Sequence, residues 1–134
     1  MAYKFGKRSQ TNLNQCTPVL KELMTRSLMT SNSDFSVICG HRGEEEQNEA
    51  YRKGNSKLKF PQSKHNKFPS EACDVVPYPL DWTDTASFEE LSEHIKHIWG
   101  IMEAEKATGD WELSWGGDWK SFKDMPHYEL KKKK

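Results

Sequence analysis

The chain lacks a long hydrophobic run and an excess of charge of either sign. Over its 134 residues, Lys plus Arg and Asp plus Glu both number 20, so no global field attracts nucleic acid. No segment approaches the roughly 18 apolar residues of a transmembrane helix, and residues 1–16 lack the apolar stretch of a secretory signal. We therefore expect a protein that binds no nucleic acid, does not span a membrane and remains in the cytoplasm after synthesis.

Cysteine is scarce, which argues against a disulfide framework. Cys16, Cys39 and Cys73 form no C-x-x-C pair, and an odd number of cysteines without a secretory signal is typical of reduced thiols. The length fits one domain with a single core, and 11% aromatic residues indicate a folded rather than a disordered chain. We predict one domain over residues 1–130, followed by a basic tail, 131–134.

Hydrophobic periodicity predicts two apolar helices. Apolar residues recur at helical spacing over 13–28 and, more clearly, over 87–102. Ser87 and Glu90 have the spacing of a capping box at the start of the second helix. Between the two, 44–54 is expected to form a short helix, because acidic residues occupy its first turn and a glycine ends it.

Short strands are predicted between and after these helices. They are expected at 34–42, 73–78, 111–117 and 127–132. In the first strand, alternation places Phe35, Val37 and Cys39 on the inner face. Helices and strands that do not alternate strictly favour the α+β class, with a small antiparallel sheet, an N-terminal helix and one long later helix.

Two segments far apart in the chain pair histidine with aspartate. "HNKFPSEACD" contains His65 and Asp74, and "DMPH" contains Asp124 and His127. A catalytic metal needs three protein ligands, an open position for water and a nearby carboxylate that accepts a proton. His65, Asp74 and His127 could be the ligands, with Asp124 as the carboxylate. The pattern alone leaves open that these are unconnected surface loops, since no spacing here is as diagnostic as H-E-x-x-H.

The other candidate ligands are weaker. His94 and His97 lie beside and opposite the apolar stripe of the long predicted helix, so we expect both to be solvated. His41 has no acidic or histidine neighbour at ligand spacing. Cys73 is a soft ligand type beside Asp74, but neighbouring residues of a strand point to opposite faces, so we expect it to pack inward.

Three segments resemble the VanY-type zinc peptidases of the LAS group. They are "GHRGEEEQNEAYRKGNSKLKFPQSKHN", "ACDVVPYPLDW" and "WGGDWKSFKDMPHYEL". In order, they match the family pattern G-x-R, a Gln on the next helix, G-x-S, S-x-H, A-x-D and D-x-x-H. The opening "FGKRSQTNLNQC" and the small size are most similar to the phage endolysins that act as L-alanyl-D-glutamate peptidases.

The resemblance implies a LAS-type zinc peptidase fold and a metal site. One Zn²⁺ per chain would be bound by His65, Asp74 and His127. Asp124 would be the catalytic carboxylate, which accepts a proton from the attacking water and returns it to the leaving amine.

Further positions of the family pattern imply further roles. Arg42 would polarise the scissile carbonyl or stabilise the oxyanion, as a fixed guanidinium suits developing negative charge. Gln47 and Ser63 match substrate-binding positions, although a helix-surface Gln and a loop Ser are equally plausible as scaffold. Four tryptophans near the site in sequence are expected to pack in the core, with one or two lining a groove for the wall polymer as the alternative: Trp82, Trp111, Trp115 and Trp119.

The implied function is that of a zinc-dependent peptidoglycan endopeptidase, an endolysin that hydrolyses the L-alanyl-D-glutamate bond of the stem peptide to lyse the bacterial host cell. A monomer made in the host cytoplasm without a signal peptide would need a holin-like membrane permeabiliser to reach peptidoglycan. Two alternatives stay open. One is a D-alanyl-D-alanine carboxypeptidase of the same group, and the other is a non-catalytic, zinc-stabilised module that binds the cell wall.

Overall fold

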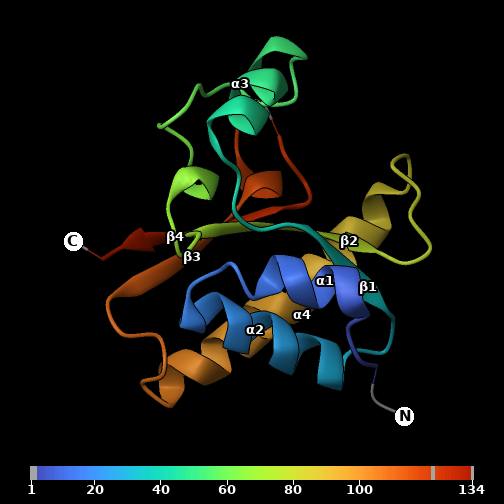
Figure 1. Ribbon diagram of the computed structural model, residues 1–134. Helices are drawn as coiled ribbons and strands as arrows, with labels where there is room; N and C mark the ends of the chain where they lie inside the picture. The colour runs from blue at the N-terminus through green and yellow to red at the C-terminus, as the bar shows by residue number, and fades with distance from the viewer. Residues whose placement is uncertain (1–2, 122, 134) are drawn as a thin grey trace.

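A four-stranded sheet forms the centre of the protein in a computed structural model that describes residues 3–121 and 123–133 (Figure 1). Its strands lie in the order β1-β2-β4-β3, and each neighbouring pair is antiparallel. The strands are β1 (Phe35–Cys39), β2 (Ala72–Pro77), β3 (Trp111–Trp115) and β4 (His127–Lys132). The predicted α+β class and antiparallel sheet are confirmed.

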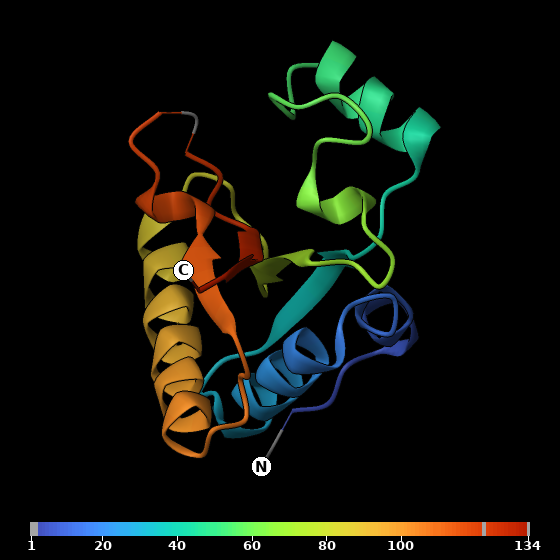
Figure 2. The ribbon, with the colours of Figure 1, turned by 90° about the vertical axis from the view of Figure 1, so that its left-hand side faces the viewer.

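The helices divide between the two faces of this sheet. α1 (Lys7–Leu13), α2 (Pro18–Thr30) and α4 (Thr85–Ala104) cover one face, while α3 (Glu44–Arg52) rises above the other (Figures 1 and 2). Two 3-10 turns, η1 (Lys64–Asn66) and η2 (Gly116–Asp118), also lie on the second face. Among the described residues, no helix is long and apolar enough to cross a membrane.

Two helices near the N-terminus replace the single helix predicted over 13–28: that helix begins only at Pro18, as α2, and α1 lies almost wholly before the predicted range. α1 ends at Leu13 and α2 starts at Pro18, because the proline lacks an N–H and forces Thr17 into extended backbone. The Thr17 side chain caps α2 by accepting the Leu20 N–H at 3.3 Å. The Thr17 N–H donates to the Ser70 carbonyl at 3.0 Å, so this break ties the N-terminal helices to the segment before β2.

The long helix α4 begins earlier than predicted. Asp84 is its N-cap and accepts the Ser87 N–H at 3.2 Å, so the predicted capping box of Ser87 and Glu90 is wrong. The predicted apolar stripe is confirmed, and all its members are buried: Phe88, Leu91, Ile95, Ile98, Trp99 and Met102. His97 is exposed as expected, whereas His94 Nε2 lies 2.9 Å from the Ser27 carbonyl of α2 and joins the two helices.

The core lies between the sheet and the three helices that cover it. Alternation along β2 sends Cys73 into this core, fully buried, as predicted, and sends Asp74 to the opposite face. All three cysteines are free thiols, as predicted from their odd number and spacing. Residues Lys131 and Lys132 of the predicted tail form the end of β4, and Lys134 lies outside the described residues.

Candidate active site

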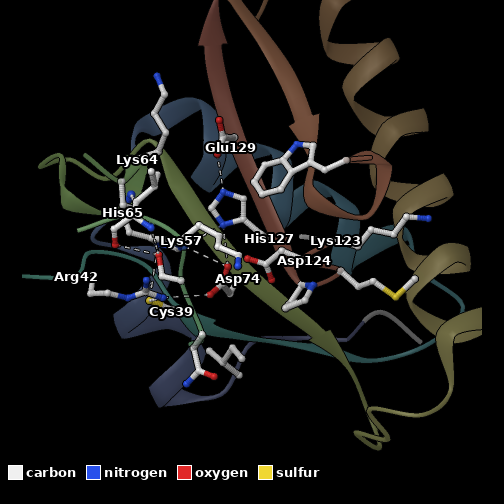
Figure 3. A pocket seen from close by; sticks show the side chains of 18 of the residues that line it. Cys39, Arg42, Lys57, Lys64, His65, Asp74, Lys123, Asp124, His127 and Glu129 are labelled. Atoms are coloured by element: carbon white, nitrogen blue, oxygen red, sulfur yellow. Dashed lines mark hydrogen bonds and ion pairs between the residues drawn. The ribbon is translucent and has the colours of Figure 1, made fainter. Parts of the chain in front are cut away.

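Three potential metal ligands meet on the open face of the sheet. Asp74 of β2 and His127 of β4 are direct cross-strand partners, and His65 reaches them from η1 (Figure 3). His65 Nε2, Asp74 Oδ1 and His127 Nδ1 lie 3.2 Å from one another, pair by pair. Donor atoms of a tetrahedral zinc site with bonds of about 2.0–2.1 Å are about 3.3 Å apart. This donor set therefore fits a zinc ion in chemistry and in spacing.

Oxygen acceptors orient both imidazole rings. His65 Nδ1 lies 2.7 Å from the Gly40 carbonyl, and His127 Nε2 lies 2.7 Å from Glu129 Oε1. A nitrogen that donates its proton to such an oxygen leaves the other nitrogen free to bind a metal. Gly40 is needed here, because a Cβ at this position would lie 2.2 Å from the Asn12 carbonyl oxygen. Residues two apart on a strand point to the same face, so the spacing of His127 and Glu129 is the sequence signal for this carboxylate, whose role was not predicted.

Cys39 also lies beside the cluster, which corrects its predicted place on the inner face of β1. A bulge between Val37 and Cys39 interrupts the alternation and turns the thiol toward the site. Cys39, His65 and Asp74 place ligand atoms within 4.8 Å of one another and so form a candidate metal-binding group. The thiol lies 3.8 Å from His65 Nδ1, the nitrogen that bonds Gly40, whereas the other ring nitrogen, Nε2, faces His127.

The charges of the cluster stabilise one another. Burial lowers the pKa of His65, but the charge of Asp74 and its hydrogen bond outweigh burial and raise that pKa to about 10. Burial also lowers the pKa of His127, but its hydrogen bonds to Asp74 and Glu129 outweigh burial and raise that pKa above its usual value. For Asp74, burial is outweighed by the charge of His65, which holds the pKa of Asp74 well below its usual range. A metal ion must therefore displace protons from these histidines.

Asp124 is brought to the cluster by a close contact between two loops. Its N–H donates to the Gly116 carbonyl at 3.1 Å, and its own carbonyl accepts the His127 N–H at 3.0 Å. Gly116 permits this approach, because a Cβ there would lie 2.2 Å from the Asp124 carbonyl oxygen. Burial, followed by the negative charge of Asp74, raises the pKa of Asp124. A half-buried carboxylate with a raised pKa beside three potential metal ligands suits a general base.

Arg42 lies on the His65 side of the cluster, and a buried amide holds it there (Figure 3). Its Nη2 is 3.6 Å from Asp74 Oδ2, and its Nη1 donates to Gln47 Oε1 at 3.0 Å. Gln47 is fully buried and donates to Ser56 Oγ at 2.9 Å and to the Leu58 carbonyl at 2.6 Å. All its hydrogen bonds are therefore made within the protein, which favours the scaffold role that the sequence left open.

Ser63 serves the site through the backbone. Its Oγ accepts the His65 N–H at 3.2 Å and so caps the turn that presents the imidazole. Ser63 is almost fully buried, although it contributes to the lining of the cavity above the cluster. Its position, too, is that of a scaffold residue.

A cavity of about 680 Å³ contains the whole arrangement. It is lined by His65, Asp74, His127, Asp124, Arg42 and Glu129, together with lysines and aromatic side chains. Of the four tryptophans near the site in sequence, Trp82 and Trp119 line this cavity, whereas Trp115 is buried and Trp111 packs against the core. A volume of this size accommodates a small ligand or a short segment of a polymer.

Two histidines and an aspartate that converge in a cavity, with a further carboxylate beside them, are the arrangement of a metal-dependent hydrolase. Comparison with known proteins gives the particular family. The model of the phage L-alanyl-D-glutamate peptidase family matches residues 1–133. The chain belongs to this family, and it is a peptidase.

Individual relatives agree with this assignment. The chain is 30% identical to the L-alanyl-D-glutamate peptidase of Escherichia phage T5 over 138 residues, which cover 98% of this chain and 92% of the phage protein. It is 31% identical over 106 residues to the peptidoglycan L-alanyl-D-glutamate endopeptidase CwlK of Bacillus subtilis (strain 168), covering 72% of this chain and 60% of that protein.

A solved structure confirms the fold. The crystal structure of the Serratia marcescens L-Ala D-Glu endopeptidase ChiX superposes with a TM-score of 0.76 at 29% identity, covering 96% of this chain and 90% of that one. The predicted resemblance to LAS-type peptidases is thus confirmed.

Proposed function

We propose that the chain is a zinc-dependent peptidoglycan endopeptidase that hydrolyses the L-alanyl-D-glutamate bond of the stem peptide. The observation that carries the proposal is the set of three donor atoms 3.2 Å apart in one cavity with Asp124. The names of the family and of the phage T5, Bacillus and Serratia relatives support the choice of bond.

In this proposal His65, Asp74 and His127 hold one zinc ion per chain. We favour His127 over Cys39 as the third ligand, because its Nδ1 lies 3.2 Å from both of the other donors. The Cys39 thiol instead adjoins the nitrogen of His65 that bonds Gly40. A zinc ion held by His65, Asp74 and His127 would act as a Lewis acid and lower the pKa of a bound water molecule toward about 7.

The residues around the ion divide the remaining work. Asp124 accepts the proton of the attacking water and returns it to the amine that leaves with D-glutamate. The guanidinium of Arg42 stabilises the negative charge that develops on the carbonyl oxygen. Gln47 fixes that guanidinium and Ser63 fixes the backbone of His65, so both act on the substrate through another residue.

We also propose a biological setting for this activity, based on the resemblance to phage endolysins. The enzyme would be made in the cytoplasm of a bacterial host and would lyse the cell by opening its peptidoglycan. A holin-like permeabiliser would give the enzyme access to its substrate. We expect a monomer, because the proposed site is assembled within one chain.

Mass spectrometry of purified peptidoglycan after digestion tests the function. We expect new L-alanine C-termini on glycan-attached stems and new D-glutamate N-termini on the released peptides. Release of free D-alanine would instead identify a D-alanyl-D-alanine carboxypeptidase, and binding without release would identify a wall-binding module. The Asp124→Asn variant, digested in parallel, controls for contaminating hydrolases.

A further inference from the structure

Trp82 presents a large aromatic surface at the wall of the active-site cavity. Its side chain lines that cavity and is nevertheless 57% exposed. Exposure of so much indole forgoes the favourable burial that tryptophan usually gains in a folded protein. None of the roles proposed above for the cluster, Asp124 or Arg42 uses this side chain.

The indole is held in a fixed orientation. Its ring stacks on Phe88 with centroids 5.6 Å apart and an interplanar angle of 18°, and Phe88 is itself buried at the start of α4. Trp82 lies within a turn that Asp81 closes, because Asp81 Oδ1 accepts the Thr83 N–H at 2.9 Å. Asp84 then caps α4. Because the ring is oriented before any ligand arrives, little conformational entropy is lost when a ligand packs against its uncovered face.

The cavity combines cationic and aromatic side chains from several segments of the chain. Its described lining includes four cationic side chains: Arg42, Lys57 and Lys64 from the stretch that follows β1 and ends in η1, and Lys123 from the stretch before β4. Trp82 comes from the loop between β2 and α4, and Phe88 from the first turn of α4. Cationic side chains suit the carboxylates of D-glutamate and the residues beyond it, whereas an aromatic plane suits the apolar C–H face of a sugar ring.

We propose that Trp82 is a saccharide-binding platform for the sugar that carries the stem peptide. The inference rests on the proposed function, because the L-alanine of peptidoglycan is joined to this sugar through a lactyl group. L-alanine and the lactyl group together span about 7 Å at the reach of an extended chain. The sugar therefore follows closely on the scissile bond, and Trp82 selects stems that are still attached to glycan.

A matched pair of soluble substrates tests this inference. One is the stem peptide with an N-acetylmuramyl group on L-alanine, and the other is the same peptide with an N-acetyl group. The readout is the ratio of kcat/KM for the muramyl substrate to kcat/KM for the acetyl substrate. We expect a wild-type ratio above one, and a ratio lowered by roughly 2- to 10-fold in Trp82→Ala, because the sugar loses its contact with the aromatic plane.

Two further variants make the test specific. Trp82→Phe keeps an aromatic plane and should retain most of the wild-type ratio. Tyr78 is an exposed aromatic residue of the same loop, but its side chain lines a different cavity. Tyr78→Ala should therefore leave the ratio unchanged. Thermal unfolding of each variant establishes that it is folded.

The outcomes separate the inference from the proposed function. A folded Trp82→Ala variant with the wild-type ratio, or one that loses activity equally on both substrates, would overturn the saccharide platform. Equal wild-type kcat/KM for the two substrates would also overturn it, while leaving the peptidase function intact. Failure of the wild-type enzyme to cleave either substrate would overturn the proposed function, and the inference with it.

Discussion

At the scale of single residues, the site depends on which nitrogen of each histidine faces the centre. The Gly40 carbonyl and the Glu129 carboxylate engage the outer nitrogens, so His65 Nε2 and His127 Nδ1 turn inward. His127→Ala removes one of three donors and should abolish both stoichiometric zinc binding and peptidoglycan cleavage. Metal analysis and a cleavage assay on one preparation check this expectation.

A matched histidine variant controls for general effects of the His127→Ala substitution. His97 is exposed on α4 and does not line the cavity, so His97→Ala should keep zinc and activity at wild-type levels. Stoichiometric zinc in the His127→Ala variant would show that our ligand set is wrong, and would point to Cys39 as the third donor.

Asp124 differs from the ligands in its expected behaviour. Asp124→Asn keeps the size of the side chain but removes the base, so the variant should fold and hold zinc nearly normally. Its activity should fall by roughly 10²- to 10⁴-fold, the range of general acid–base catalysis. Zinc content, thermal unfolding and cleavage rate measured together decide the matter. Loss of zinc would make Asp124 a ligand, and full activity would assign the proton transfer to another carboxylate.

Gln47 positions Arg42, so replacing Gln47 should lower both the stability of the protein and its catalytic rate. Gln47→Met keeps the volume but removes the hydrogen bonds of the Gln47 amide to its partly buried partners, at a cost of about 1 kcal/mol or more in the free energy of unfolding. Because the guanidinium then loses its anchor, kcat should fall while zinc content stays normal. Urea unfolding and kinetics measure both effects. Gln10→Met, at an exposed glutamine of α1, is the matched control, and wild-type kcat in Gln47→Met would refute the positioning role.

At the scale of elements, the two loops beside the cluster depend on a glycine. Gly116→Ala would force the Asp124 loop outward, because the new Cβ would lie 2.2 Å from the Asp124 carbonyl oxygen. We expect a loss of about 1–3 kcal/mol in stability from overpacking and a roughly hundredfold loss of activity from the displaced carboxylate. Chemical denaturation and cleavage rates measure the two losses.

A second glycine provides the control for this substitution. Gly100 lies on α4 with open space around its Cα, so Gly100→Ala should raise stability by about 0.5–1 kcal/mol and leave activity unchanged. If Gly116→Ala behaves in the same way as Gly100→Ala, the close approach of the two loops does not position Asp124.

Local signals predicted most elements, and the errors have local causes as well. The apolar stripe of α4 was readable, because it reflects burial on one face of the helix. Pro18 starts α2 five residues later than predicted, and Asp84 caps α4 ahead of the capping box that Ser87 suggested. The bulge at Cys39 could not be read, since it depends on pairing between β1 and β2 rather than on the residues of β1 alone.

At the scale of the whole molecule, the cluster joins parts of the chain that only the sheet brings together. Asp74 and His127 are 53 residues apart, yet the register of β2 against β4 makes them partners. The spacing of residues identified both as candidate ligands, but it could not exclude that they lie in unconnected surface loops. The register between two strands is set by non-local packing, which local spacing does not reveal. The family resemblance predicted the grouping, and hydrogen bonds of the folded chain explain it.

A metal ion that links η1, β2 and β4 should stabilise the whole fold, and the effect should depend on pH. In the metal-free protein the pKa of His65 is raised to about 10, from an unfolded value near 6.5. Its proton therefore contributes stability that is complete below about pH 6.5 and is lost as the pH rises toward 10. Metal binding has the opposite dependence, because the ligand histidines must first lose their protons, which becomes easier at higher pH.

The difference in Tm between zinc-loaded and chelator-treated protein should consequently widen from pH 6 to pH 9. The metal-free form loses the contribution of protonated His65 over this range, while the loaded form gains affinity for its ion. His127→Ala, which lacks a ligand, should show almost no difference between the two treatments at any pH. A gap that narrows as the pH rises would mean that the ion does not compete with these protons, and so is bound by groups other than His65 and His127.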